Sequence, residues 1–142
     1  MRFLLDTDHI SILQKLAGKE YAILSGRISQ HPRTDFAFSV VSFHEQVLGC
    51  NAYLSRARHA AVVVRGYAML TGVFRDFATN VMLSFDTPAA TVFDGLLAQR
   101  VRVGTMDLRI ASIALSQGLI LLTRNTSDFN KVPGLQFQDW TV

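Results

Sequence analysis

The sequence predicts an α/β fold, specifically a three-layer α/β/α sandwich with a mostly parallel central sheet. The chain has 142 residues, of which 49% are hydrophobic and 18% charged, a composition typical of a compact globular protein. This length suits one domain, and no repeat or linker divides it, so we expect a single domain over residues 1–142. Short apolar runs alternate with longer segments of helical periodicity, which implies parallel strands joined by right-handed crossovers, with helices on both faces.

The first half of the chain is predicted to contain two buried strands and four helices. Its apolar runs and stop signals indicate a strand at 3–5, a helix from Thr7 to a stop at Gly18, a helix at 20–30 and a strand at 36–41. Ser42 and Glu45 have the spacing of a capping box, so the next helix is expected to start at Ser42. A longer helix is predicted at 58–79, apolar on most faces, as expected for a buried or dimer-forming helix.

The second half alternates in the same way. A strand is predicted at 81–85, followed by a helix with Thr87 as N-cap and Pro88 as its first residue, running to about Arg100. A helix from Thr105 is expected to end at Gly118. The remaining predicted elements are a buried strand at 119–122, a polar loop at 123–131 and an edge strand at 135–137.

Four acidic residues fall where this fold would bring them together. Asp6 follows the first strand, Glu45 and Asp107 lie in the first turns of helices, and Asp128 lies in the loop after the fourth strand. In an open parallel sheet these positions share the edge formed by the carboxyl ends of the strands. Clustered carboxylates repel one another unless a cation lies among them, and an all-oxygen set suits Mg²⁺ or Mn²⁺. The pattern therefore predicts a metal site suited to phosphate chemistry.

Each acid also has a purely structural interpretation. Glu45 could close the capping box, Asp107 could complement a helix dipole, and Asp6 or Asp8 could be an N-cap. Taken singly, these explanations are about as good as a functional one. They do not explain why all four acids fall on one edge of the sheet, so the joint pattern favours a site.

Charge and cysteine content limit the partners and the compartment. The formal net charge is +3, with eleven Arg and three Lys, and the guanidinium group of Arg matches phosphate geometry better than an ammonium does. Cys50 is the one cysteine, so no internal disulfide forms, and we expect a reducing, cytoplasmic location. No segment has the pattern of a secretory signal or a membrane span.

Four segments resemble, in order, the motifs of the PIN-domain family, and most closely those of its VapC toxin group. The first is an apolar run ending in Asp-Thr, the second has a Ser three residues before a Glu, and the third has an Asp followed by Ile-Ala. The fourth is similar to the family's C-terminal segment, including the later Pro-Gly and Asp-Trp pairs. The segments are LLDTDHIS at 4–11, SVVSFHEQVLG at 39–49, GTMDLRIASIA at 104–114 and LTRNTSDF at 122–129.

The resemblance implies an endoribonuclease that depends on Mg²⁺ or Mn²⁺ and is the toxin of a bacterial toxin–antitoxin pair. It also implies a homodimer and a VapB-like antitoxin as partner. Asp6, Glu45 and Asp107 match the family carboxylates that bind metal and position the attacking water. Many PIN domains have an Asp at the position of Asn125, so Asp128 is expected to act as the fourth catalytic acid in a supporting role.

Further residues are expected to assist this site. Thr7, Ser42, Thr123 and Asn125 are candidates for orienting the carboxylates through hydrogen bonds. Arg56, Arg58, Arg100, Arg102 and Arg124 are candidates for binding the RNA backbone. A solvated helix end or a contact with the antitoxin would explain these arginines equally well.

Two other classes of protein share part of the pattern. A haloacid-dehalogenase-like phosphatase would use Asp6 as nucleophile and Asp8 as acid/base, but the double-acid motif is absent and no lysine follows the proper strand. A non-enzymatic phospho-receiver would also need a lysine there, where the sequence has Arg124. A catalytically weak PIN scaffold would have lost acids, whereas the three principal ones are present.

Overall fold

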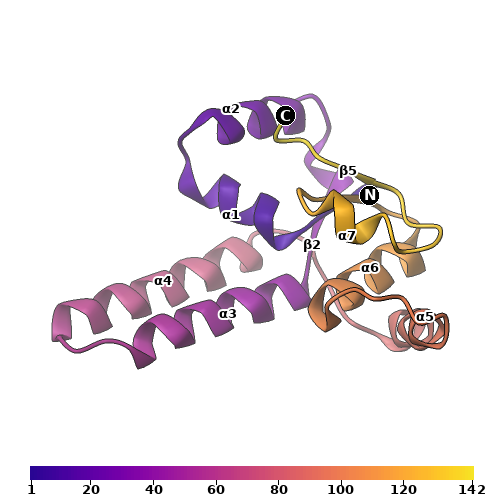
Figure 1. Ribbon diagram of the computed structural model, residues 1–142. Helices are drawn as coiled ribbons and strands as arrows, with labels where there is room; N and C mark the ends of the chain where they lie inside the picture. Colours follow the sequence, from indigo (N-terminus) through magenta and orange to yellow (C-terminus); the bar gives the residue numbers. More distant parts are fainter.

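The central sheet has five strands, all parallel, in the order β3-β2-β1-β4-β5. The computed structural model describes residues 1–142 and is shown in Figure 1. The predicted α/β fold with a parallel sheet is therefore confirmed. The strands are β1 (Phe3–Leu5), β2 (Phe36–Ser39), β3 (Met82–Leu83), β4 (Ile120–Leu122) and β5 (Phe137–Gln138).

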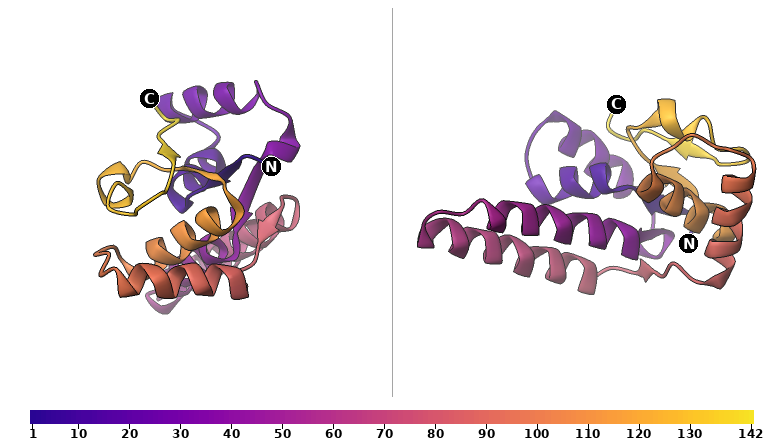
Figure 2. Two further views of the ribbon diagram at one scale, coloured as in Figure 1. Left: turned by 90° about the vertical axis from the view of Figure 1, so that its right-hand side faces the viewer. Right: turned by 60° about the horizontal axis from the view of Figure 1, so that its bottom comes forward.

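Seven α-helices connect and cover these strands. They are α1 (Thr7–Lys15), α2 (Lys19–Ile28), α3 (Val40–Ser55), α4 (Ala60–Ala78), α5 (Thr87–Ala98), α6 (Thr105–Gln117) and α7 (Thr126–Phe129), with a short 3₁₀ helix at Arg33–Asp35. Helices α3 and α4 run side by side as a long hairpin that projects away from the sheet (Figures 1 and 2). None of the helices combines the length and apolar character needed to cross a membrane.

The sheet separates two hydrophobic cores because alternate side chains of a strand point to opposite faces. Leu4 and Leu121 belong to one core, which lies beneath α5 and α6. Phe3, Leu5 and Leu122 belong to the other, which contains side chains from α1, α2 and α4. Helix α3 contributes to both cores. This double burial explains why the strands are continuous apolar runs in the sequence.

The boundary between β2 and α3 differs from the prediction. The strand ends at Ser39, and the Ser39 hydroxyl caps α3 by accepting a hydrogen bond from the amide of Ser42 (3.0 Å). The predicted capping box of Ser42 and Glu45 is therefore wrong, and Glu45 lies in the second turn of α3 rather than the first. Strand pairing with β3, which includes Ser39 opposite Leu83, determines where the strand ends.

Other element ends also differ. Helix α1 ends at Lys15, and Leu16 takes the left-handed conformation (φ 56°), so the predicted stop at Gly18 is wrong; Gly18 precedes α2 instead. Asp86, not Thr87, caps α5 by accepting from the amide of Ala89 (3.1 Å). Gly118 ends α6 in the left-handed conformation as predicted.

The C-terminal region contains one element that the sequence did not predict. The expected polar loop at 123–131 includes the four-residue helix α7. The edge strand lies at Phe137–Gln138, two residues later than expected at its start.

Candidate active site

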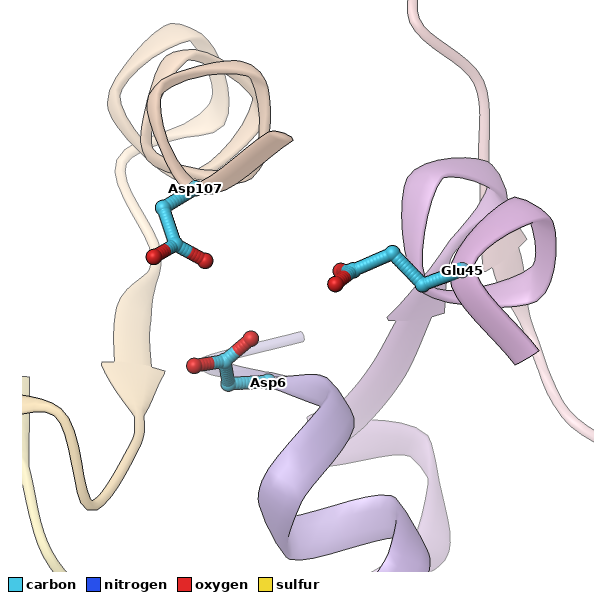
Figure 3. Close-up of side chains that lie close together, drawn as sticks. All are labelled: Asp6, Glu45 and Asp107. Atoms are coloured by element: carbon cyan, nitrogen blue, oxygen red, sulfur yellow. The ribbon is translucent and has the colours of Figure 1, made fainter. Parts of the chain in front are cut away.

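Three carboxylates converge at the edge formed by the carboxyl ends of the strands. Asp6 follows β1 and is the N-cap of α1, Glu45 projects from α3, and Asp107 lies in the first turn of α6. One oxygen from each lies within 4.8 Å of the other two. Figure 3 shows the three side chains pointing toward one another. Asp6, Glu45 and Asp107 together form an acidic triad.

The fold explains why these residues meet. Strands β2 and β4 flank β1 in parallel, so the helix that follows β1 and the one that follows β2 both begin at the same edge. Helix α6 packs against α3, which brings Asp107 to this edge. The positive ends of the helix dipoles at α1 and α6 favour carboxylates there.

Hydroxyl and amide groups orient the triad. The Thr7 hydroxyl donates to Glu45 Oε1 (2.9 Å) and lies 2.9 Å from the hydroxyl oxygen of Ser42. The Thr123 hydroxyl donates to Asp6 Oδ2 (2.7 Å), while Asp6 Oδ1 accepts from the Thr7 amide (2.8 Å). The structure thus places three of the four predicted supporting residues in contact with the triad or with one another.

Asn125, the fourth supporting residue, connects Asp107 to Asp128. Its Nδ2 donates to Asp107 Oδ2 (3.3 Å) and to Asp128 Oδ2 (3.1 Å). Asp128 lies outside the triad, its side chain is 40% exposed, and Lys131 Nζ lies 3.4 Å from its Oδ1. These contacts with Asn125 and Lys131 lower the pKa of the Asp128 carboxyl. The position next to Asp107 is therefore occupied by an amide, and the fourth acid acts on Asp107 only at a distance.

The triad holds more negative charge than its surroundings balance. Burial, then the charges of Asp8 and Asp107, raise the pKa of Asp6 to about 7, against hydrogen bonds from Thr123 and Thr7 that lower it. Burial is also the first cause of the raised pKa of Glu45 and of Asp107. None of the ion pairs in the protein involves a member of the triad.

This arrangement fits a divalent cation. Three partly or fully buried carboxylates without a basic partner are costly when ionised, and a hard cation among them removes that cost. An all-oxygen donor set matches Mg²⁺ and Mn²⁺ rather than zinc. The residues present are therefore suited to hold such an ion.

A cavity of about 690 Å³ adjoins the triad between α1, α3 and α4. Thr7 and Glu45 line this cavity, and so does Arg56, at the end of α3. The other four predicted RNA-binding arginines do not line it. Arg58 lies in the α3–α4 connection, Arg100 and Arg102 lie between α5 and α6, and Arg124 follows β4; all four are exposed.

The sequence did not indicate the contacts of Asp8 and His9. His9 is fully buried (0% exposed). Its ring bonds the Asp8 carboxylate and the backbone of Trp140. Because Trp140 lies 131 residues away in the chain, no local pattern could have indicated this contact.

The all-parallel sheet and the acidic triad at its carboxyl edge define a PIN-type α/β domain, the class that the sequence motifs predict. No protein-family model matches the chain. The chain is 31% identical over 144 residues to Ribonuclease VapC1 of Haemophilus influenzae, covering 99% of each protein. It is 38% identical over 74 residues to the tRNA(fMet)-specific endonuclease VapC of Shigella flexneri, a match that spans 49% of this chain and 56% of that relative. Among solved structures, VapBC-1 from nontypeable Haemophilus influenzae covers all of both chains with a TM-score of 0.76 and 25% identity.

The chain belongs to the VapC family, as the full-length match shows. Membership of this family favours the nuclease interpretation over the phosphatase alternative. The structure gives no support to a phosphatase either, since Lys131 pairs with Asp128. Asp8, the acid/base of that alternative, is bound by the His9 ring and the Arg124 amide.

Proposed function

We propose that the protein is a Mg²⁺- or Mn²⁺-dependent endoribonuclease and the toxin of a bacterial toxin–antitoxin pair. The acidic triad carries this proposal, because three carboxylates converge within 4.8 Å and none of them forms an ion pair. The names of the relatives support the choice of RNA, since they are a ribonuclease and a tRNA-specific endonuclease.

Asp6, Glu45 and Asp107 would hold the divalent ion. When bound, such an ion would make a coordinated water more acidic and would neutralise charge that develops on the phosphate. The Thr7 and Thr123 hydroxyls keep one oxygen of Glu45 and one of Asp6 engaged. These hydrogen bonds hold the Asp6 and Glu45 carboxylates in one orientation, which preorganises the site for phosphodiester hydrolysis.

The cavity beside the triad would receive the RNA strand. Arg56 lies at its border, where a guanidinium can bind a phosphate of the RNA backbone with two parallel hydrogen bonds. Asp128 has a supporting role in this proposal, because it reaches Asp107 only through Asn125. If water attacks phosphorus and the 3′-oxygen of the upstream nucleotide leaves with a proton, the products carry 5′-phosphate and 3′-hydroxyl ends.

The partners of this function are a VapB-like antitoxin and a second copy of the chain. The solved structure of VapBC-1, which has the same fold as this chain, supports an antitoxin as partner. Helix α4 has exposed apolar side chains, among them Val64, Tyr67 and Phe74. They support a surface on this helix that a partner protein covers. A basic antitoxin side chain among the triad would compete with the metal ion for the same carboxylates.

The test is cleavage of an end-labelled RNA pool, with initiator tRNA included because a relative is named for it. Purified, antitoxin-free protein is incubated with Mg²⁺ or Mn²⁺, beside Asp6→Asn and the matched control Asp94→Asn, whose residue is exposed on α5. We expect discrete fragments from the wild type and the control, and none with EDTA or with Asp6→Asn. Protein that binds the metal and cleaves none of these RNAs would instead indicate a non-catalytic PIN scaffold.

A further inference from the structure

A further acid, Asp8, lies beside the triad without belonging to it. Its side chain is 32% exposed, and it lies in the first turn of α1, where the helix dipole favours a carboxylate. The dipole explains the charge but not the contacts. Both oxygens are engaged by groups outside the α1 backbone, namely the ring of His9 and the amide of Arg124.

The proton on His9 is fixed by its two partners. His9 Nε2 lies 3.2 Å from the backbone nitrogen of Trp140, which can only donate, so Nε2 accepts. The neutral ring then has its proton on Nδ1, which lies 2.7 Å from Asp8 Oδ1 and donates to it. His9 is fully buried, so no water competes for these bonds. The ring therefore holds the Asp8 carboxylate in one orientation.

The held carboxylate in turn binds the segment that follows β4. Asp8 Oδ2 accepts from the amide of Arg124 (2.9 Å) and lies 3.5 Å from the Thr123 hydroxyl. This segment includes the two side chains that orient the triad from the β4 side: Thr123, which donates to Asp6, and Asn125, which donates to Asp107. The backbone amide of Asn125 also donates to Thr123 Oγ1 (3.0 Å).

From this continuous path of hydrogen bonds we propose that Asp8 and His9 are positioning residues, which fix the segment 123–125 so that Thr123 and Asn125 hold Asp6 and Asp107 in metal-binding geometry. This inference rests on the proposed function. Asp8 lies close enough to the triad for its charge to add to the repulsion there, but it is not one of the three carboxylates that converge. Its contribution is the orientation of the segment rather than a bond to the ion. Partners of this kind typically change metal affinity by about 10- to 100-fold.

Three variants separate positioning from charge and from stability. Asp8→Asn leaves one side-chain oxygen where Asp8 has two. That oxygen can accept from His9 Nδ1 or from the backbone amide of Arg124, but not from both. His9→Phe keeps the charge of Asp8 and removes the bond to it. His9→Asn keeps a donor at the position of Nδ1 and removes the groups at Nε2, namely the hydrogen bond from Trp140 and the 3.8 Å approach to Asp139 Oδ1. The matched control is Ile12→Val, a buried substitution on the same helix outside the path.

The measurement is Mn²⁺ affinity of the full chain by titration calorimetry, together with the midpoint of thermal unfolding. We expect Asp8→Asn and His9→Phe to weaken Mn²⁺ binding about tenfold or more. His9→Asn and Ile12→Val should lower the unfolding midpoint yet bind Mn²⁺ within about twofold of the wild type. Wild-type affinity in His9→Phe would overturn the proposal, because a purely structural histidine would affect only the unfolding midpoint.

A crystal structure of metal-free Asp8→Asn gives a readout that needs neither metal nor RNA. We expect the contacts of Thr123 with Asp6 and of Asn125 with Asp107 to be lost or lengthened, and their retention would overturn the positioning role. If these contacts and the Mn²⁺ affinity change as expected but the wild type cleaves no RNA, the proposed function fails while the positioning of the triad stands. If the wild type cleaves RNA and His9→Phe binds Mn²⁺ with wild-type affinity, the positioning role fails while the proposed function stands.

Discussion

Replacing Asp6 with Asn should stabilise the metal-free protein at neutral and alkaline pH. Asp6 is 5% exposed, and burial with the neighbouring charges raises its pKa from 3.8 to about 7. Between these two pH values the native protein holds a proton that the unfolded chain has released. The unfolded state then binds fewer protons than the native state, so the free energy of unfolding falls as the pH rises through this range.

The size of the effect follows from the shift. A rise of roughly 3 in the pKa of Asp6 corresponds to a loss of about 4 kcal/mol at most in the free energy of unfolding. None of this loss is present at pH 3, and all of it is present at pH 8. Relaxation of the site and entry of water reduce this value, so we expect at least ~1 kcal/mol. For a chain of this length ~1 kcal/mol changes the unfolding midpoint by about 3 °C. The raised pKa values of Glu45 and Asp107 act in the same direction.

The assay is thermal unfolding in EDTA at several pH values from 4 to 8, on wild type, Asp6→Asn and the control Asp94→Asn. The wild type and the control should lose stability toward pH 8, whereas Asp6→Asn should lose much less and unfold several degrees higher at pH 8. Added Mn²⁺ should restore the wild type at pH 8 and have little effect on Asp6→Asn. A variant that is less stable than the wild type at pH 8 would refute the argument that the triad carries unbalanced charge.

Further predictions concern the groups around the triad. Thr123→Val removes the donor to Asp6 and should weaken Mn²⁺ binding about tenfold in calorimetry; unchanged affinity would contradict this. Arg56→Ala should raise the KM for RNA severalfold and leave kcat nearly unchanged, and a change in kcat alone would refute its role at the cavity. Asp128→Asn should slow cleavage, but less than loss of a triad member does. Gly66→Ala adds a methyl group that collides with a leucine of α3, so it should cost about 1–3 kcal/mol in denaturant unfolding while folded protein keeps its Mn²⁺ affinity.

The sequence predicted the architecture well because both of its signals are local. Apolar runs identify strands such as β1, and helical periodicity identifies the segments between them. The rule that parallel strands end at one edge then placed Asp6 and Asp107 together without knowledge of any contact. The same rule also predicted Asp128 at this edge, but Asp128 lies outside the triad.

Features decided by distant partners could not be predicted. Ser39 and Ser42 are both suitable helix caps, and only the pairing of β2 with β3 determines which of them ends the strand. The burial of His9 depends on Trp140, and the position of Asp128 depends on α7. Each of these details requires a contact between segments that the sequence does not show to be neighbours.

The central position of β1 in the sheet has a consequence for the order in which the protein folds. Strand β1 pairs directly with β4, the Thr123 hydroxyl that orients Asp6 is 117 residues from it in the chain, and His9 bonds the backbone of Trp140, 131 residues away. Contacts between residues so far apart in the sequence close a long loop, so they carry a large entropic cost and form slowly. We therefore expect a partly folded chain, in which β1 has not yet paired with β4, to contain the three acids of the triad without the geometry that binds a metal ion.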